Sequence, residues 1–463
     1  MTILLLALLA AADWPQFRGP NGSGIADDKD LPVQVGKRNL VWKTPLPPGH
    51  SSPVIAGQHI FVTAHEGRAL LTIALDRATG RELWRKQAPR PRAEGMAPGN
   101  SPASPTPVTD GASVWVFFGD FGVLSYNAAD GAERWRAPLG PFNNANGHGS
   151  SPVLVDDKVI LICDQDTDSF LLALDKNTGQ VRWKTARPEV TRGYATPVIY
   201  QPPGGPKELI VPGAYQVIAY RADTGEKLWW VEGMAWQLKS VAAIGDGIIY
   251  VSGWEIGGDF ERSVRTQNFE EALAAHDTNR DGRIGPGEAP AGGIREMFPA
   301  YDLNGDRTLD AREWNFLSLQ RGALNNVVAI RHGGRGDLTA TNVLWRYRKS
   351  LPNTPSPLLY RDVLYLVKDG GIVTALDPKT GRVHKQARLP GAAERYWASP
   401  VAGDGKVYLL SDAGKLMVLR AGKDWDVIGA SDLEEECYAT PAIVDGRLYV
   451  RTRVALYCFA KRD

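Results

Sequence analysis

Alternating apolar and polar positions divide most of the chain into short predicted strands joined by tight turns. One such unit, ALDRATGRELW, spans residues 74–84 and contains an apolar strand, a turn of the form Asp-x-x-Thr-Gly, and a second strand that ends in Trp84. The turn glycine supplies a positive φ angle, and the Asp side chain accepts hydrogen bonds from the turn backbone. The unit therefore predicts a β-hairpin.

The same unit recurs as YNAADGAERW (126–135), ALDKNTGQVRW (173–183), AYRADTGEKLW (219–229) and ALDPKTGRVHK (375–385). A second marker, Ser or Thr followed by Pro and an apolar residue, opens an apolar strand before each unit, where a proline loses no ladder hydrogen bond. Its prolines are Pro53, Pro107, Pro152, Pro197, Pro357, Pro400 and Pro441, and Ser240-Val241-Ala242 is a degenerate copy. With Val241 counted as the fifth marker, the separations are 54, 45, 45, 44, 116, 43 and 41 residues.

This period predicts an all-β chain that forms an eight-bladed β-propeller of four-stranded units, with seven blades as the alternative. The last unit ends after three strands, and NLVWKTPL (39–46) offers the missing one. We therefore expect strands from the N- and C-termini to close the ring, which removes exposed sheet edges. The repeat's tryptophans are expected to pack between blades; they are Trp84, Trp135, Trp183, Trp229 and Trp345.

The single long separation contains a segment of different character, residues 259–321, which is charged and has helical spacing. Two loops in it have the oxygen-ligand spacing of an EF-hand calcium site. The ligands of the first loop are Asp277, Asn279, Asp281, the Arg283 carbonyl and Glu288. Those of the second loop are Asp302, Asn304, Asp306, the Thr308 carbonyl, Asp310 and Glu313. Arg307 takes the place of the turn glycine in the second loop, which weakens that site.

The two loops predict a small α-helical EF-hand pair inserted in blade five. Ile284 and Leu309 occupy matching positions and are expected to form the short β contact that joins the loops. The predicted core of the pair consists of Met297, Phe298, Trp314 and Leu317. Calcium is expected to be mainly structural, because it orders a segment that buries little apolar surface by itself.

Charge and composition narrow the classes of partner and compartment. Lys and Arg total 53 against 52 Asp and Glu, so no net field favours nucleic acid. The three cysteines, Cys163, Cys437 and Cys458, do not form a disulfide framework.

Residues 1–12 contain an apolar run too short to span a bilayer, which predicts a signal peptide. We expect an exported monomer in the periplasm or cell envelope, with neither a lipid anchor nor a transmembrane span, and a propeller that comprises residues 13–258 and 322–463.

The repeat A-x-D-x-x-T-G-x-x-x-W resembles the PQQ-like (pyrroloquinoline-quinone-like) propeller repeats of quinoprotein alcohol dehydrogenases and BamB-like proteins. The opening WPQFRGPNGSG (14–24) is similar to that of exported bacterial members of this group, as found in planctomycetes. The resemblance implies a propeller, and two activities: a PQQ-dependent alcohol or sugar dehydrogenase, or a scaffold of outer-membrane assembly. The adjacent cysteines of the quinone enzymes and their Glu/Asn/Asp calcium set have no counterpart here.

Residues directly before the Ser/Thr-Pro markers are expected to converge at one mouth of the central channel. They are His50, Asn100, His148, Arg192, Tyr194, Lys239, Trp397 and Tyr438. Such a polar and aromatic ring suits a small anionic or sugar-like ligand, and the alternative is a solvated rim of loops. The hypothesis is an exported, non-catalytic binding or scaffold protein with a protein or carbohydrate partner. The PQQ-dependent dehydrogenase and the BamB-type scaffold remain as alternatives.

Overall fold

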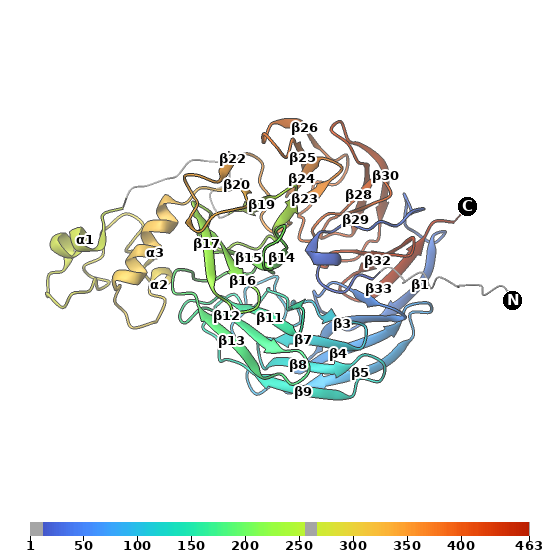
Figure 1. Cartoon of the computed structure of the whole chain (residues 1–463), viewed down its shortest axis with the longest axis horizontal. Coiled ribbons are helices and arrows are strands. Elements are labelled where there is room, and N and C mark those ends of the chain that lie inside the picture. Colours follow the sequence, from blue (N-terminus) through green and yellow to red (C-terminus); the bar gives the residue numbers. More distant parts are fainter. Residues whose placement is uncertain (1–12, 255–265, 463) are drawn as a thin grey trace.

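The computed structural model describes residues 13–254 and 266–462, and in them eight small sheets surround a central axis (Figure 1). The eight-bladed β-propeller is therefore confirmed over the seven-bladed alternative. The predicted signal peptide at residues 1–12 lies outside the described residues, as does the start of the segment 259–321. No helix in the described part of the chain is long and apolar enough to cross a membrane.

Blades one to four each contain four consecutive antiparallel strands. Blades one and two comprise β2 (Val54–Ala56), β3 (His59–Glu66), β4 (Ala69–Asp76), β5 (Glu82–Ala88), β6 (Val108–Thr109), β7 (Ser113–Phe118), β8 (Gly122–Asn127) and β9 (Glu133–Pro138). Blades three and four comprise β10 (Val153–Val155), β11 (Lys158–Cys163), β12 (Phe170–Asp175), β13 (Val181–Ala186), β14 (Val198–Tyr200), β15 (Glu208–Gly213), β16 (Gln216–Arg221) and β17 (Lys227–Glu232). The short β21 (Gly336–Asp337) adds to blade four, parallel to β17.

The remaining blades include two that join strands distant in sequence. Blade five comprises β18 (Ala243–Gly245), β19 (Ile248–Gly253), β20 (Asn326–Arg331) and β22 (Val343–Tyr347). Blades six and seven comprise β23 (Leu358–Tyr360), β24 (Val363–Lys368), β25 (Ile372–Leu376), β26 (Val383–Arg388), β27 (Val401–Gly403), β28 (Lys406–Leu410), β29 (Lys415–Arg420) and β30 (Asp426–Asp432). Blade eight comprises β31 (Ala442–Val444), β32 (Arg447–Arg451), β33 (Ala455–Ala460) and β1 (Leu40–Pro45), with Lys43 opposite Tyr457.

The repeat tryptophans pack between blades, as the sequence predicts, and four of them lie against the turn glycine of the next blade: Trp84, Trp135, Trp183 and Trp345. Trp229 instead packs among residues of blades four and five and donates a hydrogen bond to Glu208. A Cβ atom added to Gly131 in blade two would lie 2.6 Å from the Trp84 indole of blade one. The Trp84 Nε1–H also donates a hydrogen bond to the Ala128 carbonyl in the same turn, at 3.0 Å. The glycine and the tryptophan of the repeat therefore form one contact between neighbouring units. Only glycine permits it, since Gly131 has a φ of 69° and no space for a side chain.

The Ser and Thr residues of the strand markers form a hydrogen-bonded ring around the channel. At seven junctions a backbone N–H at the marker position of one blade donates to the marker hydroxyl of the next, over 2.9–3.0 Å. In blade five the residue at this position is Val241, and β18 begins at Ala243. The sequence alignment that placed Ser240 at the hydroxyl position was therefore wrong by one residue. Val241 and Ala242 occupy the places of Ser/Thr and Pro, so this blade alone contributes no hydroxyl.

The segment between β19 and β20 contains the helices α1 (Phe269–His276), α2 (Phe298–Tyr301) and α3 (Ala311–Gly322) and extends from one side of the ring (Figure 1). α1 and α3 each begin with a capping box, at Asn268 and Asp310 respectively. The described core includes Phe298, Trp314 and Leu317 but not Met297, which is 49% exposed. The prediction for Met297 was wrong because it directly precedes α2, where its side chain points to solvent.

Candidate functional site

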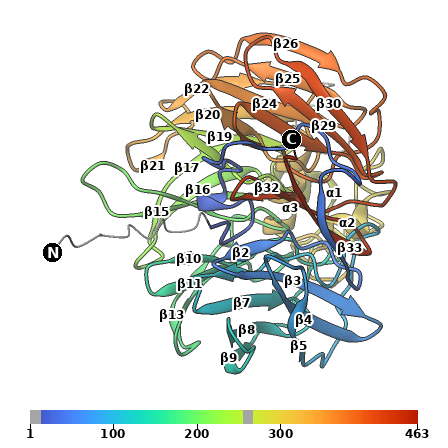
Figure 2. The same ribbon diagram turned by 90° about the vertical axis from the view of Figure 1, so that its right-hand side faces the viewer.

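The segment Trp14–Gly24 crosses the central channel and connects blades on opposite sides. Its first residue exchanges two backbone hydrogen bonds with Ile55 of blade one, at 2.8 and 2.9 Å. The Asn21 side chain accepts from the backbone N–H of Ile199 in blade four and donates to the carbonyl of the same residue. The last residue accepts a hydrogen bond from the Ala402 N–H of blade seven, at 2.7 Å. Figures 1 and 2 both show this segment, in blue, among the inner strands.

Glycine and buried side chains explain how this segment fits the channel. Gly19 has a φ of 68°, and a Cβ atom there would lie 2.5 Å from the ring of Trp14. Trp14 and Arg18 are both fully buried, and the Arg18 guanidinium donates to the Pro357 carbonyl at 3.0 Å. Burial lowers the pKa of Arg18 to about 9. Phe17 between them lines a cavity, so the segment forms the floor of that cavity.

The cavity has a volume of about 540 Å³ and is bounded by residues from all eight blades. Its aromatic and imidazole side chains are Phe17, His50, Tyr194, Trp236, Trp254, Trp397 and Tyr438. Its amide side chains are Asn100, Asn146, Gln237 and Asn353, and the marker hydroxyls lie toward the floor. Among the described residues that line it, Lys239 is the only basic group besides the imidazole, and none is acidic. A volume of this size is in the range of small-molecule sites.

Six of the eight residues expected at the channel mouth line this cavity: His50, Asn100, Tyr194, Lys239, Trp397 and Tyr438. His148 does not line it; it is buried between blades, with its ring 4.4 Å from that of Phe142. Arg192 does not line it either, because it pairs with Asp166 and lies over the ring of Trp236. The two predictions were wrong for different reasons: Arg192 turns to the carboxylate of Asp166, and His148 packs against the rings of Phe117 and Phe142.

Asn146, Trp236, Gln237 and Asn353 are among the lining side chains that sequence reasoning missed. Asn146, Trp236 and Gln237 belong to the same loops as predicted residues, whereas Asn353 lies before the marker of blade six, where no residue was predicted. Each lies a few positions before a strand marker. The signal was therefore present, because each of these residues is closer to its marker than the predicted Asn100 is to Thr106. The floor formed by Trp14–Gly24 had no such signal, because the repeat does not contain it.

The cavity wall between blades eight and one is a stack of neutral rings. His50 and Tyr438 have ring centroids 4.1 Å apart with an interplanar angle of 15°, and Trp397 lies 6.0 Å from Tyr438. Burial, and then the positive charge of Arg451, lower the pKa of His50 to about 3, so its imidazole is neutral near pH 7. Elsewhere in the lining, Lys239 donates a hydrogen bond to the Asn353 amide oxygen at 3.0 Å.

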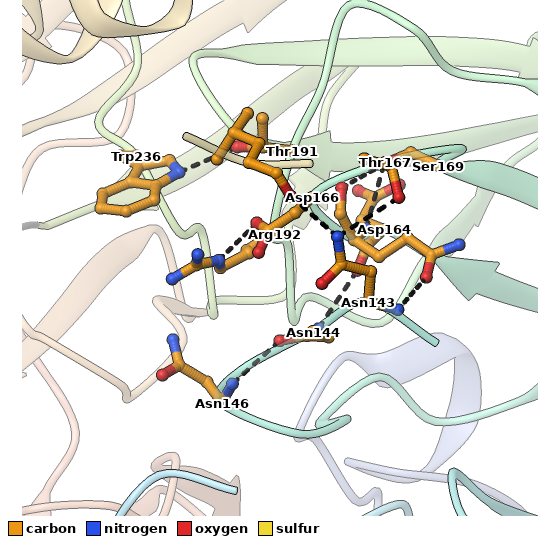
Figure 3. Close-up of polar contacts among 12 residues, drawn as sticks. Asn143, Asn144, Asn146, Asp164, Asp166, Thr167, Ser169, Thr191, Arg192 and Trp236 are labelled. Atoms are coloured by element: carbon orange, nitrogen blue, oxygen red, sulfur yellow. Dashed lines mark hydrogen bonds and ion pairs between the residues drawn. The ribbon is translucent and has the colours of Figure 1, made fainter. Parts of the chain in front are cut away.

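A polar network lies beside the opposite wall (Figure 3), and the inserted segment contacts it. The Trp236 indole donates to Thr191 Oγ1 at 2.9 Å, and Arg192, which lies over the ring of the same indole, pairs with Asp166. From the insert, Arg312 donates to the Asp166 carbonyl at 3.0 Å. Nearby, Asn143 donates to the carbonyl of Leu303, in the second loop, at 2.8 Å. The wall of the cavity and the second loop therefore contact a common set of side chains.

The two loops of the insert have the same internal hydrogen bonds. In the first, Asp277 accepts from the N–H groups of Arg280 and Gly282, and Glu288 accepts from Thr278 and Gly285. In the second loop, Asp302 and Glu313 accept from the equivalent N–H groups. Arg307 has a φ of 66°, which is the left-handed turn that its position requires.

The predicted contact between the loops is confirmed, since Ile284 and Leu309 form an antiparallel bridge. The oxygen donors are hard ligands of the kind that calcium takes. These oxygens belong to carboxylates, amides and backbone carbonyls. In the described ranges, no three His, Cys, Asp or Glu side chains lie close enough together to hold one metal ion. Occupancy by calcium would therefore draw the loop side chains inward.

The lining does not fit PQQ, whose carboxylates need several cations around them. Lys239 alone among the described lining residues carries a side-chain ammonium or guanidinium. The quinone enzymes have two adjacent cysteines, whereas the three cysteines here are far apart in sequence, buried and absent from the lining: Cys163, Cys437 and Cys458. Burial raises the pKa of the Cys437 thiol to about 12 and that of Cys458 to about 11, so both are unreactive thiols.

The fold and the floored cavity define an eight-bladed propeller of the PQQ-like repeat class. The family model described as outer membrane protein assembly factor BamB matches residues 36–167 and 320–463, which is more than half of the chain. The chain belongs to this family. No match among curated proteins was found.

Solved structures share the fold at low sequence identity. BamB from Moraxella catarrhalis is 13% identical with a TM-score of 0.56, over 90% of this chain and 100% of that one. The quinohemoprotein alcohol dehydrogenase ADHIIG from Pseudomonas putida HK5 is 13% identical with a TM-score of 0.61, over 97% and 80%. A europium-containing methanol dehydrogenase is 11% identical with a TM-score of 0.57, over 97% and 98%. These similarities establish the architecture, and at such identities they do not transfer an activity.

Proposed function

We propose that this chain is an exported, non-catalytic binding protein whose ligand site is the floored cavity. The observation that carries the proposal is the cavity itself, which is sealed by Trp14–Gly24 and walled by aromatic and amide side chains. Its groups suit binding better than catalysis. His50 is a weak base because of its lowered pKa, and the marker hydroxyls are engaged as acceptors between blades.

A test of the non-catalytic part is dye-linked alcohol oxidation by the purified protein with added PQQ and calcium. We expect no turnover above that of PQQ and calcium without protein. Turnover that is lost in a Trp397→Ala variant would overturn the proposal and favour the quinoprotein dehydrogenase. The control is Trp230→Ala, a tryptophan on the outer strand β17 outside the cavity lining.

A second candidate is a scaffold of outer-membrane assembly, favoured by the family to which the chain belongs. In that case a protein partner occupies a face of the propeller, and a pull-down from an envelope extract would recover assembly components. The chain is proposed to act as a monomer, with β1 paired to β33 closing the ring. If the chain is exported, residues 1–12 are removed as a signal peptide. N-terminal sequencing of the mature protein tests this removal.

We further propose that the insert is an EF-hand pair with a calcium ion in each loop. Matching hydrogen bonds in the two loops and the Ile284–Leu309 bridge support it. The role of calcium is mainly structural, since it neutralises the carboxylates and holds the helices together. Limited proteolysis and thermal unfolding with and without a chelator test it. We expect faster cleavage between β19 and β20 in chelator, and unchanged cleavage together with an unchanged melt would contradict the proposal.

A further inference from the structure

We propose that the floored cavity binds a neutral saccharide, an inference that rests on the proposed binding function. The first argument is the arrangement of aromatic faces. Tyr438 and Trp397, from blades eight and seven, line one side of the channel, while Tyr194 and Trp236, from blades four and five, line the opposite side. The face of an aromatic ring has negative potential and attracts the polarised C–H groups of a sugar ring. A ligand between these walls would contact aromatic side chains on two sides.

The second argument is the kind of polar group between the aromatic walls. The Asn146 amide donates to Tyr194 Oη at 2.8 Å, and its oxygen has no partner among the described residues. The Asn353 amide oxygen accepts from Lys239, and its nitrogen has no partner there either. One amide thus offers an acceptor and the other a donor. Sugar hydroxyls both donate and accept, so they can satisfy both groups.

The third argument is the floor of hydroxyls. Thr106 Oγ1 accepts from the Ser52 N–H at 2.9 Å, and Ser151 Oγ accepts from the Thr106 N–H at 2.9 Å. Each hydroxyl oxygen that accepts in this way keeps its own proton for donation. Ser399 uses its proton in a hydrogen bond to Ser356 Oγ at 3.2 Å. The other marker hydroxyls, such as those of Thr106 and Ser151, present O–H donors near the base of the cavity, where the oxygens of a bound sugar can accept them.

The fourth argument is charge. None of the described lining residues is acidic, and Lys239 already donates to an amide oxygen. A polycarboxylate such as PQQ would bury several negative charges beside one ammonium, which is costly when the charges are not paired. A neutral saccharide carries no such cost. The volume of about 540 Å³ accommodates one to a few sugar rings.

Isothermal titration calorimetry of the full chain with defined probes tests this inference. The probes are glucose, N-acetylglucosamine, cellobiose, chitobiose, glucuronate and PQQ. We expect a neutral sugar or disaccharide to bind more tightly than glucuronate or PQQ. The Trp397→Ala variant should weaken that binding about three- to ten-fold or more, because a stacked aromatic contact is lost. Trp230→Ala, outside the lining, should leave it unchanged. If Trp397→Ala fails to fold, Tyr438→Phe serves as the second lining variant, because it keeps the aromatic ring and removes only one hydroxyl.

The outcomes separate the ligand class from the binding function. If glucuronate or PQQ binds more tightly than every neutral sugar, and Trp397→Ala weakens that binding, the saccharide inference is wrong and the binding function stands. If no probe binds at millimolar concentration, the saccharide inference is also wrong. If sugars bind but Trp397→Ala and Trp230→Ala weaken binding equally, the cavity is not the site, and both proposals fail.

Discussion

The imidazole of His50 stacks on the phenol ring of Tyr438, with centroids 4.1 Å apart, and so joins the first blade to the last at the cavity wall. Both residues directly precede a strand marker, which places their side chains at the inner end of adjacent blades. The imidazole in this stack is neutral near pH 7, because burial and the nearby Arg451 lower the pKa of His50. This wall of the cavity is therefore uncharged at neutral pH.

Acid should destabilise the protein partly through His50. Its pKa is about 3 in the folded chain against an ordinary value of 6.5. Above pH 6.5 the group is neutral in both states and has no effect. Between pH 6.5 and about 3 the unfolded chain binds a proton that the folded chain does not, so stability falls as the pH falls, by up to about 1.4 kcal/mol per pH unit.

Urea unfolding of the wild type and His50→Gln between pH 7 and pH 4 measures this effect. At pH 7 the free energy of unfolding of the variant should be about 0.5–1.5 kcal/mol below that of the wild type, because the contact between the two rings is lost. It should then lose less stability than the wild type on acidification. Parallel curves for the two proteins over this range would show that His50 is not the titrating group.

The contact between the turn glycine Gly131 and Trp84 of the preceding blade should make Gly131→Ala strongly destabilising. The new methyl would meet the Trp84 ring at 2.6 Å, and the residue has a φ of 69°. We expect a cost of about 2–4 kcal/mol in thermal or urea unfolding, from strain and overpacking together. Gly67→Ala is the matched control, with a φ of 55° and open space around it, and should cost about 1 kcal/mol. Equal losses would contradict the account of the inter-blade contact.

Asn21 anchors the cavity floor to blade four by two hydrogen bonds with Ile199, at 2.7 and 2.9 Å. Asn21→Gly removes both bonds and tolerates the φ of 49° at this position, so it should cost about 1–2 kcal/mol. Asn21→Ala adds strain of about 1 kcal/mol. Thermal unfolding of the two variants separates these effects. A glycine variant as stable as the wild type would mean that this anchor does not hold the floor.

The two loops of the insert should differ in their effect on the cavity, although they share one hydrogen-bond pattern. Glu313 in the second loop is 2% exposed and accepts from the Leu303 N–H at 2.8 Å, next to the contact of Leu303 with Asn143. Glu288 is at the equivalent position of the exposed first loop. In calcium, Glu313→Gln should therefore raise hydrogen exchange in residues 186–196 and 234–239, while Glu288→Gln should not. Equal exchange in the two variants would show that the second loop does not support the cavity wall.

The repeating parts of the fold could be predicted from the sequence, because each blade contains the same local interactions. The turn glycine, the tryptophan and the marker proline recur with one period, and that period determines the number of blades. Prediction from the sequence failed where a residue has no counterpart in the other blades. The floor at Trp14–Gly24 is held by long-range contacts such as Asn21 with Ile199, which leave no periodic signal.

Side-chain direction was the second limit of the sequence. Tyr194 lines the cavity, while Arg192, two residues earlier, pairs with Asp166, because a carboxylate is available beside it. His148 is enclosed by Phe117 and Phe142, which come from other parts of the chain. The shift at Val241 had a similar origin, since the absence of proline left the alignment without a fixed point.

Native mass spectrometry of the protein after incubation with a small-molecule fraction of a cell-envelope extract tests the central claim most directly. If the floored cavity is the functional site, the wild type and Trp230→Ala should retain the same bound mass, and a variant with both Trp397→Ala and Tyr438→Ala should lose it. Retention of that mass by all three proteins, or by none, would contradict the claim.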